Sequence, residues 1–188
     1  IKVCGIKTPR DADRVLEIAL YEMGLPPDGL KLGMILWPNS KRSVTAEVGR
    51  VIAAVGNNAG VDPVGVFVDE TAEAMQQTCL EVGTTIAQLH GPKCRRHGRD
   101  LPSSIEKIRV VDVRPDGTLV PDPTMVDDNA ALALGGVRPW RIYDAKGGGT
   151  GKAFDWGRFA SVVEGEDRWL LAGGLSASNV AAAVARLR

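Results

Sequence analysis

Ile142 to Trp156 reads IYDAKGGGTGKAFDW: an apolar run that ends at Asp144, then a run of glycines, then an amphipathic segment. The pattern predicts a buried strand with one carboxylate at its carboxyl end, a glycine loop and the beginning of a helix. Glycine takes positive φ without steric cost, and loop amides and a helix N-terminus attract anions. The stretch is therefore typical of a phosphate site, although a flexible connection between a strand and a helix has the same composition.

Strand and helix patterns alternate along the rest of the chain. Apolar runs predict strands over residues 1–6, 31–37, 63–68, 85–90, 105–113, 141–145 and 169–173. Amphipathic runs predict helices over 8–21, 45–55, 71–82, 125–134 (a weak one), 154–164 and from the capping residue Ser178 to the end. Two segments break the pattern: 92–102 is predicted to be an irregular loop in place of a helix, and 114–123 an exposed excursion.

Such alternation predicts a parallel sheet covered by helices, either a closed (β/α)8 TIM barrel or an open doubly wound sheet. Several residues suited to a binding site follow well-separated strands, and only a barrel brings them to one mouth: Cys4, Arg42, His90, Asp144 and Gly173. We therefore predict a single TIM-barrel domain over residues 1–188. Because such a barrel has eight strands, we expect the last β/α unit, with strand 8, to be absent from this sequence.

Composition restricts the partners. The chain has 188 residues, a formal net charge of zero and a pI of about 6.9, so its charge favours neither nucleic acid nor an anionic membrane. No apolar run approaches the roughly 20 residues of a membrane span. Three cysteines without a CxxC pair suit a reducing compartment. Cys94 and His97 are too few ligands for a metal site. We expect a small-molecule partner.

Six motifs follow one another along the chain: KVCGIKTPRDA (2–12), SKRSV (40–44), VGVFVDE (64–70), QLHG (88–91), GGTGKAFDW (148–156) and LAGGLSASNV (171–180). Together they resemble the phosphoribosylanthranilate isomerase family over nearly the whole chain. The resemblance implies the third step of tryptophan biosynthesis. That step is an Amadori rearrangement of N-(5-phosphoribosyl)anthranilate to 1-(2-carboxyphenylamino)-1-deoxyribulose 5-phosphate, with no metal and no organic cofactor.

The resemblance also implies the catalytic pair. Asp144 matches the general acid that protonates the ribose ring oxygen, and Cys4 matches the general base that removes the proton from C2. A thiol is a weak base at neutral pH unless a cation favours its thiolate. Lys2, one pleat away on the same strand face, is expected to do so, or else to close the bottom of the barrel in an ion pair. Asp144 must stay protonated to donate, which an apolar pocket favours.

Substrate binding follows from the same resemblance. Arg42 matches the arginine over the anthranilate carboxylate, a task for which a guanidinium offers two parallel hydrogen bonds. His90 is expected to line the mouth, with Gln88 supporting it on the same strand face. Backbone amides are expected to hold the phosphate at Gly148, Gly149, Gly151, Gly173 and Gly174, and the loop after strand 8 would add the rest. Asp155 is interpreted as structural, in the first turn of its helix.

Taken without the resemblance, Cys4 is a small buried apolar residue, Asp144 a capping or loop aspartate and Arg42 a surface arginine. Two other functions stay open. One is another phosphate-binding barrel enzyme of the tryptophan or histidine pathways, such as indole-glycerol-phosphate synthase, whose catalytic lysines and glutamates are absent here. The other is a non-catalytic barrel fragment that binds phosphosugars. The resemblance allows fusion to, or association with, another tryptophan-pathway enzyme. We expect a cytoplasmic location, or the plastid stroma in a photosynthetic eukaryote.

Overall fold

The computed structural model describes residues 1–125, 139–146 and 152–187. Seven strands join in chain order into one sheet, and the defined registers are parallel. The strands are β1 (Lys2–Cys4), β2 (Lys31–Ile35), β3 (Asp62–Phe67), β4 (Ile86–Leu89), β5 (Glu106–Val113), β6 (Trp140–Ala145) and β7 (Trp169–Leu171). The helices are α1 (Pro9–Leu16), α2 (Ala46–Asn58), α3 (Ala72–Val82), α4 (Pro92–His97), α6 (Trp156–Val163) and α7 (Val180–Leu187). The predicted alternation is confirmed.

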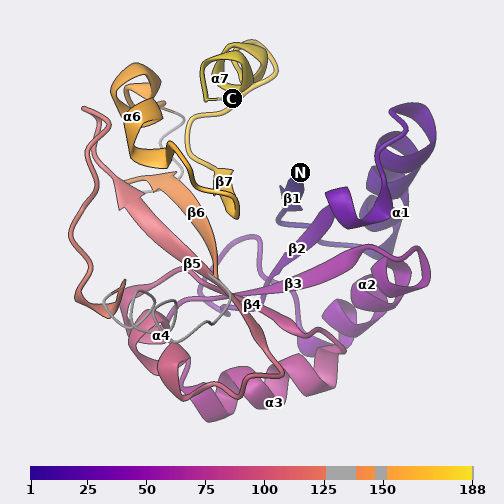
Figure 1. Cartoon of the computed structure of the whole chain (residues 1–188). Helices are drawn as coiled ribbons and strands as arrows, with labels where there is room; N and C mark the ends of the chain where they lie inside the picture. The colour runs from indigo at the N-terminus through magenta and orange to yellow at the C-terminus, as the bar shows by residue number, and fades with distance from the viewer. Residues whose placement is uncertain (126–138, 147–151, 188) are drawn as a thin grey trace. The chain divides into compact units, whose positions relative to one another are not determined.

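The chain divides into two compact units, Ile1–Ile108 and Arg109–Arg188, with the boundary inside β5. In the first unit, α1, α2 and α3 lie in a row along one face of β1 to β4 (Figure 1). The side chains that fill the layer between sheet and helices alternate along the strands, for example Leu32 and Met34 on β2 and Ala87 and Leu89 on β4. Because neighbouring residues of a strand point to opposite faces, Gly33 and Gln88 face away from the helices. The prediction of a single domain stays a prediction.

The first three helices begin at threonine caps, which lie in the loops that follow β1, β2 and β3. The Thr8, Thr45 and Thr71 side chains accept hydrogen bonds from backbone amides of the first helical turn. At α1 the cap is reciprocal, because the Asp11 carboxylate also accepts from the Thr8 amide at 3.1 Å. These caps place the beginnings of the helices at the carboxyl ends of the strands. The predicted helix over 8–21 continues past α1 as a π-helical turn, Glu17–Glu22.

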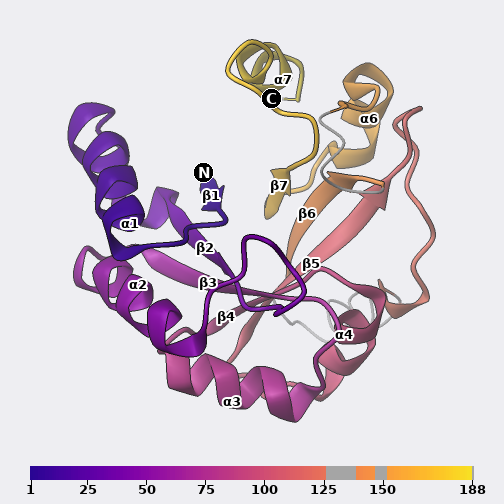
Figure 2. The ribbon, with the colours of Figure 1, turned by 180° about the vertical axis from the view of Figure 1, so that it is seen from behind.

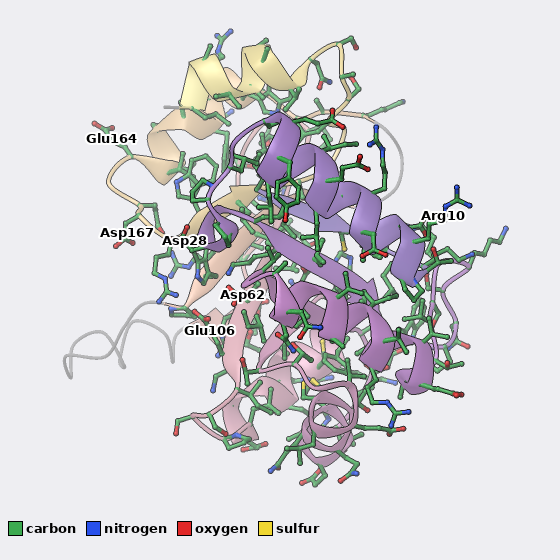
Figure 3. All side chains as sticks on the ribbon, turned by 90° about the vertical axis from the view of Figure 1, so that its right-hand side faces the viewer. Arg10, Asp28, Asp62, Glu106, Glu164 and Asp167 are labelled. Atoms are coloured by element: carbon green, nitrogen blue, oxygen red, sulfur yellow. The ribbon has the colours of Figure 1, made fainter. Side chains whose placement is uncertain are left out.

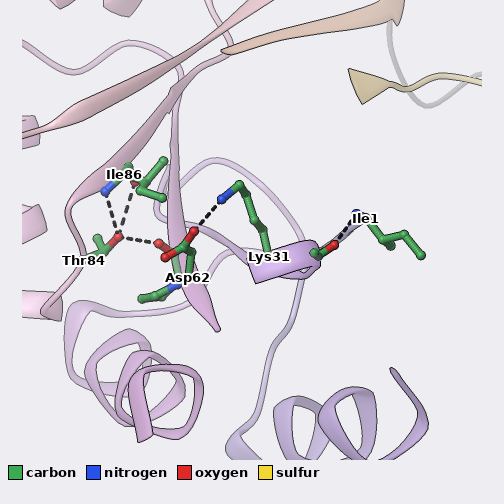
Figure 4. A network of polar contacts seen from close by, with 7 residues as sticks. Ile1, Lys31, Asp62, Thr84 and Ile86 are labelled. Atoms are coloured by element: carbon green, nitrogen blue, oxygen red, sulfur yellow. Dashed lines mark hydrogen bonds and ion pairs between the residues drawn. The ribbon is translucent and has the colours of Figure 1, made fainter. Parts of the chain in front are cut away.

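The amino ends of the strands are closed by polar contacts. Lys31 Nζ lies 2.5 Å from Asp62 Oδ2, and the Thr84 hydroxyl donates to the Pro63 carbonyl at 2.6 Å (Figure 4). Within the first unit, Asp28 and Asp62 lie on the side opposite Arg10, which follows the carboxyl end of β1 (Figure 3). Lys31 thus makes an ion pair at this end of the sheet, whereas for Lys2 none is recorded among the residues that the structure describes.

In the second unit, α6 and α7 lie side by side (Figure 2). Tyr143 of β6 packs edge-to-face on Phe159 of α6, with ring centroids 5.0 Å apart, and Phe154 and Trp169 complete this aromatic core. Because Tyr143 faces the helices, the next residue, Asp144, faces the other side of the sheet. A largely buried ion pair joins Arg141 and Glu166 near the amino end of β6, with 2.7 Å between the Arg141 Nη1 and Glu166 Oε1 atoms.

The prediction of an irregular loop over 92–102 is wrong. Residues 92–97 form α4, followed by a 3-10 turn, Gly98–Asp100. Pro92 occupies the first helical position, and the buried Cys94 thiol donates to the Phe67 and Gly91 carbonyls at 3.2 Å. The helix is too short to show an apolar period, and contacts with β3 hold it in place.

The segment 114–123, predicted to be an exposed excursion, is exposed at Pro115, Asp116, Pro121 and Pro123, but its middle is held against the protein. Arg114 donates to the Leu119 carbonyl at 2.6 Å, and the two-residue bridge between Val113 and Leu119 is antiparallel. Gly117, with φ of +80°, is buried where a Cβ would lie 2.5 Å from the Asp155 carbonyl oxygen. The segment thus folds back onto the beginning of α6.

Three further predictions concern the helices of the second half. Helix α6 begins at Trp156 rather than at 154, and α7 begins at Val180 rather than after a Ser178 cap. The weak helix over 125–134 lies almost wholly outside the described residues. Within the part of the chain that the structure describes, no helix has the length and apolar character needed to cross a membrane.

Candidate active site

Of the three thiols, only Cys4 is exposed. Burial raises the pKa of Cys79 from 9.0 to about 12 and that of Cys94 from 9.0 to about 11. Both buried thiols therefore stay protonated at neutral pH and are unsuited to accept a proton. Cys4 ends β1 and is open to a ligand, so the interpretation of Cys4 as a small buried apolar residue is wrong.

Lys2 and Cys4 meet over Gly33 of the neighbouring strand. A Cβ at Gly33 would lie 2.7 Å from Lys2 Nζ and 2.9 Å from Cys4 Sγ, so the ammonium and the sulfur flank one point. Cys4 and Gly33 are also direct partners in the parallel register of β1 and β2. Because glycine has no side chain, position 33 leaves room for the Lys2 ammonium and the Cys4 thiol on the same face of the sheet. The predicted placement of Lys2 beside Cys4 is thus supported by the geometry of the two strands.

Arg42 reaches the same edge from the loop after β2. A Cβ at Gly5 would lie 2.9 Å from Arg42 Nη1, so the guanidinium covers the residue that follows Cys4. The turn that carries Arg42 is fixed by its own amide, which donates to Ser40 Oγ at 3.2 Å. Arg42 is exposed, and its cation is available to an anionic group brought to the carboxyl end of β1.

Gln88 and His90 lie together at the carboxyl end of β4. Gln88 Nε2 is 3.5 Å from His90 Nδ1, and the His90 amide donates to the Phe67 carbonyl at 2.9 Å. This contact orients the imidazole, whose ring nitrogens donate or accept according to the tautomer. Gln88 is 5% exposed, and its Oε1 has no hydrogen-bond partner among the described residues. The shared face predicted for these two residues agrees with their contact.

In the second unit, Asp144 follows the buried residues Ile142 and Tyr143 and is itself half-buried. Gly173, after β7, lies directly against it: a Cβ there would be 2.7 Å from Asp144 Oδ1 and 2.6 Å from the Ala145 Cβ. Gly174 approaches the next segment of the chain, where a Cβ would be 2.2 Å from the Ala153 amide nitrogen. These two glycines bring the loop after β7 against both ends of the loop after β6.

The remaining predicted phosphate-loop glycines, Gly148, Gly149 and Gly151, lie outside the described residues. The neighbouring helix terminus is described, and it already holds an anion of its own. The Asp155 carboxylate accepts from the Gly157 amide at 2.9 Å and from the Arg158 amide at 3.1 Å. Asp155 is therefore structural, as predicted, but as the N-cap of α6. A phosphate at this edge would depend on loop amides rather than on the α6 terminus.

The sequence interpretation missed three residues: Gly5 and Gly33, described above, and Asn179, whose side chain contacts the Ser176 amide and the Gly174 carbonyl in the loop after β7. Gly33 carried a usable signal, because a lone glycine inside an apolar strand indicates a close approach by another group. Gly5 and Asn179 carried none that singles them out, since glycine after a strand and asparagine before a helix are common.

Comparison with known proteins gives one consistent result. The family model for N-(5'phosphoribosyl)anthranilate (PRA) isomerase matches residues 1–188. N-(5'-phosphoribosyl)anthranilate isomerase 1, chloroplastic, of Arabidopsis thaliana is 31% identical over the whole of this chain, which covers 63% of that relative. The isomerase of Chlamydia felis is 30% identical, again over the whole chain and over 81% of the relative. The chain thus spans less than two thirds of the length of its plant relative.

Solved structures agree. Monomers of the dimeric phosphoribosylanthranilate isomerase of Thermotoga maritima match with a TM-score of 0.71 and 26% identity, covering the whole chain and 81% of that structure. The enzyme of Thermus thermophilus matches with a TM-score of 0.67 and 27% identity, covering 98% of this chain and 82% of that one. The predicted TIM-barrel fold class is confirmed by these matches, and the strands of the described residues follow one another in chain order, as they do in such a barrel.

Proposed function

Because the chain belongs to the N-(5'-phosphoribosyl)anthranilate isomerase family, we propose that the protein catalyses the Amadori rearrangement of N-(5-phosphoribosyl)anthranilate. The product is 1-(2-carboxyphenylamino)-1-deoxyribulose 5-phosphate, and the reaction is the third step of tryptophan biosynthesis. The observation that carries the proposal is the grouping at the end of β1: an exposed thiol, Cys4, beside the Lys2 ammonium and next to Gly5, which the Arg42 guanidinium covers.

Two proton transfers make up the reaction. Asp144, as a carboxylic acid, donates its proton to the ribose ring oxygen; the bond from C1 to that oxygen breaks, and the nitrogen lone pair forms the C=N bond of a Schiff base. The Cys4 thiolate then removes the proton from C2; the C2–H electron pair forms the C1=C2 bond of an enol while the C=N pair returns to nitrogen, and the enol tautomerises to the ketone by moving its hydroxyl proton to C1. Cys4 ends as a thiol and Asp144 as a carboxylate, so a proton returns from one to the other through solvent.

The other predicted residues bind the substrate. Arg42 holds the anthranilate carboxylate through two parallel hydrogen bonds. His90, oriented by Gln88, offers a ring nitrogen to the substrate. The buried Gln88 Oε1 accepts a hydrogen bond from the substrate or from an ordered water. The amides of Gly148, Gly149, Gly151, Gly173 and Gly174 hold the phosphate. Fusion to, or association with, another pathway enzyme stays a prediction, as does a location in the cytoplasm or plastid stroma.

The test is the fluorescence decrease of phosphoribosylanthranilate, generated in place, in the presence of the full-length protein. Cys4→Ala and Asp144→Ala should each abolish turnover while the fold, followed by circular dichroism, is kept. Asp167→Ala is the matched control, since Asp167 is an exposed carboxylate near the amino end of β7. Absence of turnover in the wild type would overturn the proposal and favour a barrel that only binds phosphosugars. Turnover that survives either substitution would reject the assigned role of that residue.

A further inference from the structure

One side chain ties down the turn after β7. Asn179 Oδ1 accepts from the Ser176 amide at 2.8 Å, and Asn179 Nδ2 donates to the Gly174 carbonyl at 2.8 Å. Both polar atoms of the Asn179 side-chain amide therefore make hydrogen bonds, and these connect Asn179 to residues 174 and 176. Asn179 directly precedes α7, whose first amide, of Val180, donates to the Ser176 carbonyl at 3.0 Å. The turn is thus fastened to the beginning of a helix.

The fastened turn contains the two most adaptable residues of this edge. Gly173 has φ of +81° and Gly174 has φ of +67°, a region that residues with a Cβ rarely adopt. Consecutive glycines lose more conformational freedom on ordering than any other pair of residues. A specific contact is needed to keep them in one arrangement, and Asn179 supplies it at Gly174.

The arrangement matters because of what the turn touches. Gly173 lies against the carboxylate oxygen Oδ1 of Asp144 and the backbone of Ala145, and Gly174 lies against the backbone of 152–153. With so little space, the turn restricts how the Asp144 carboxyl group can rotate. A shift of the turn would release or displace that group.

We propose that Asn179 is a positioning residue for Asp144, acting through the Gly173–Gly174 turn. The inference rests on the proposed function, in which Asp144 is the general acid. An acid that has lost its orientation toward the ring oxygen transfers its proton more slowly, but the substrate is still held elsewhere. Loss of the Asn179 contact should therefore lower kcat by a larger factor than it raises KM, because Gly173 and Gly174 supply only part of the proposed phosphate site and Arg42 still holds the substrate.

The test compares Asn179→Ala with Asn179→Asp in the full-length protein. Aspartate keeps the acceptor for Ser176 and the size of the side chain, but it cannot donate to Gly174. Both variants should lose kcat by about 10- to 100-fold, the range that follows a misplaced reacting group. Ser178→Ala is the matched control, because Ser178 is exposed near the same turn and its hydroxyl is hydrogen-bonded, within the described part of the chain, to that of Ser176 alone.

Two further measurements separate positioning from a general loss of structure. Gly173→Ala acts on the same contact with Asp144, so combining it with Asn179→Ala should cost no more kcat than the larger single effect. Hydrogen exchange at the amides of 173–176 should be faster in Asn179→Ala and unchanged in Ser178→Ala, whether or not turnover is observed.

The outcomes are distinct. An inactive wild type refutes the proposed function, and the exchange data then decide whether Asn179 holds the turn. An active wild type whose kcat is unaffected by Asn179→Asp refutes the positioning role. So does a fully additive double variant, or a kcat loss of the same size in Ser178→Ala. If Asn179→Ala fails to fold, Asn179→Asp provides the comparison, because it keeps one of the two hydrogen bonds.

Discussion

The Arg42 guanidinium lies over the backbone of Gly5, with Nη1 2.9 Å from the position that a Gly5 Cβ would occupy. Gly5 has φ of +87°, and its amide donates to the Gly33 carbonyl at 2.9 Å. Gly5, which follows the proposed base Cys4, is thus fixed on one side by β2. On the other side it is covered by Arg42, which we propose binds the carboxylate of the substrate. Any side chain at this position would change where the guanidinium lies.

Gly5→Ala should therefore raise KM. The new methyl group meets Arg42 Nη1, and the positive φ adds strain of about 1–3 kcal/mol. Gly24→Ala is the matched control, because Gly24 has φ of +67° with nothing within 4 Å of a built Cβ. Steady-state kinetics and thermal unfolding should show a lower Tm in both variants but a higher KM only in Gly5→Ala. An equal KM in the two would contradict the contact.

Arg42→Lys should weaken substrate binding although the charge is kept. A lysine ammonium cannot make two parallel hydrogen bonds to one carboxylate. Loss of a charged hydrogen bond costs about 1.5–3 kcal/mol, so KM should rise by about 10- to 100-fold, with a smaller change in kcat. Lys41→Ala, in the exposed neighbour of the same turn, should leave KM as it is. A KM that stays at the wild-type value in Arg42→Lys would remove Arg42 from the binding site.

Alkylation should distinguish the three thiols. In the native protein iodoacetamide should label Cys4 alone, because Cys79 and Cys94 are buried, and in denaturant it should label all three. Mass spectrometry of the digested protein gives the sites. Lys2→Met should slow the labelling of Cys4, since the thiolate is the reactive form and a nearby cation favours it. Lys7→Met, an exposed lysine just beyond β1, should not. Equal labelling rates in the two variants would argue against the role of Lys2.

Stability should fall at alkaline pH. Burial raises the pKa of Cys79 and of Cys94 from 9.0 to about 12 and about 11, so above pH 9 the unfolded chain loses these protons while the folded protein keeps them. The free energy of unfolding therefore decreases as pH rises through this window, by up to about 1.4 kcal/mol per pH unit for each thiol. Urea unfolding between pH 8 and pH 11, as approximate limits of this window, should show a shallower slope for Cys79→Ala. An unchanged slope would contradict the assignment.

Much of the fold was open to prediction from local pattern. Apolar runs located the strands and amphipathic runs located α1 to α3, because both signals are contained within one strand or a few helical turns. Helix α4 was missed because it is held by contacts of the buried Cys94 thiol with β3 and with Gly91. The periodicity of the local sequence does not reveal such contacts. The beginning of α7 was misplaced because three residues that can each cap a helix, Ser176, Ser178 and Asn179, stand close together in the sequence.

For the candidate site, too, some residues could be predicted from the sequence and others could not. Lys2, Cys4, Arg42, Gln88 and His90 were predicted residue by residue. The structure brings Lys2 and Cys4 together over Gly33, places Arg42 over Gly5 and sets Gln88 beside His90. Their roles stay predictions. Gly5, Gly33 and Asn179 were not, since their importance lies in what other segments place against them. A glycine is informative only when its neighbour in space is known.

The sequence by itself determined the order of strands and helices, the caps that begin the first helices and the residues that end the strands, because these depend on contacts between near neighbours in the chain. The tertiary structure alone decided which glycines make room for Lys2, Cys4, Arg42 and Asp144, and which thiols are buried. Those properties arise from close packing between segments far apart in sequence, where a single Cβ determines whether two groups can meet.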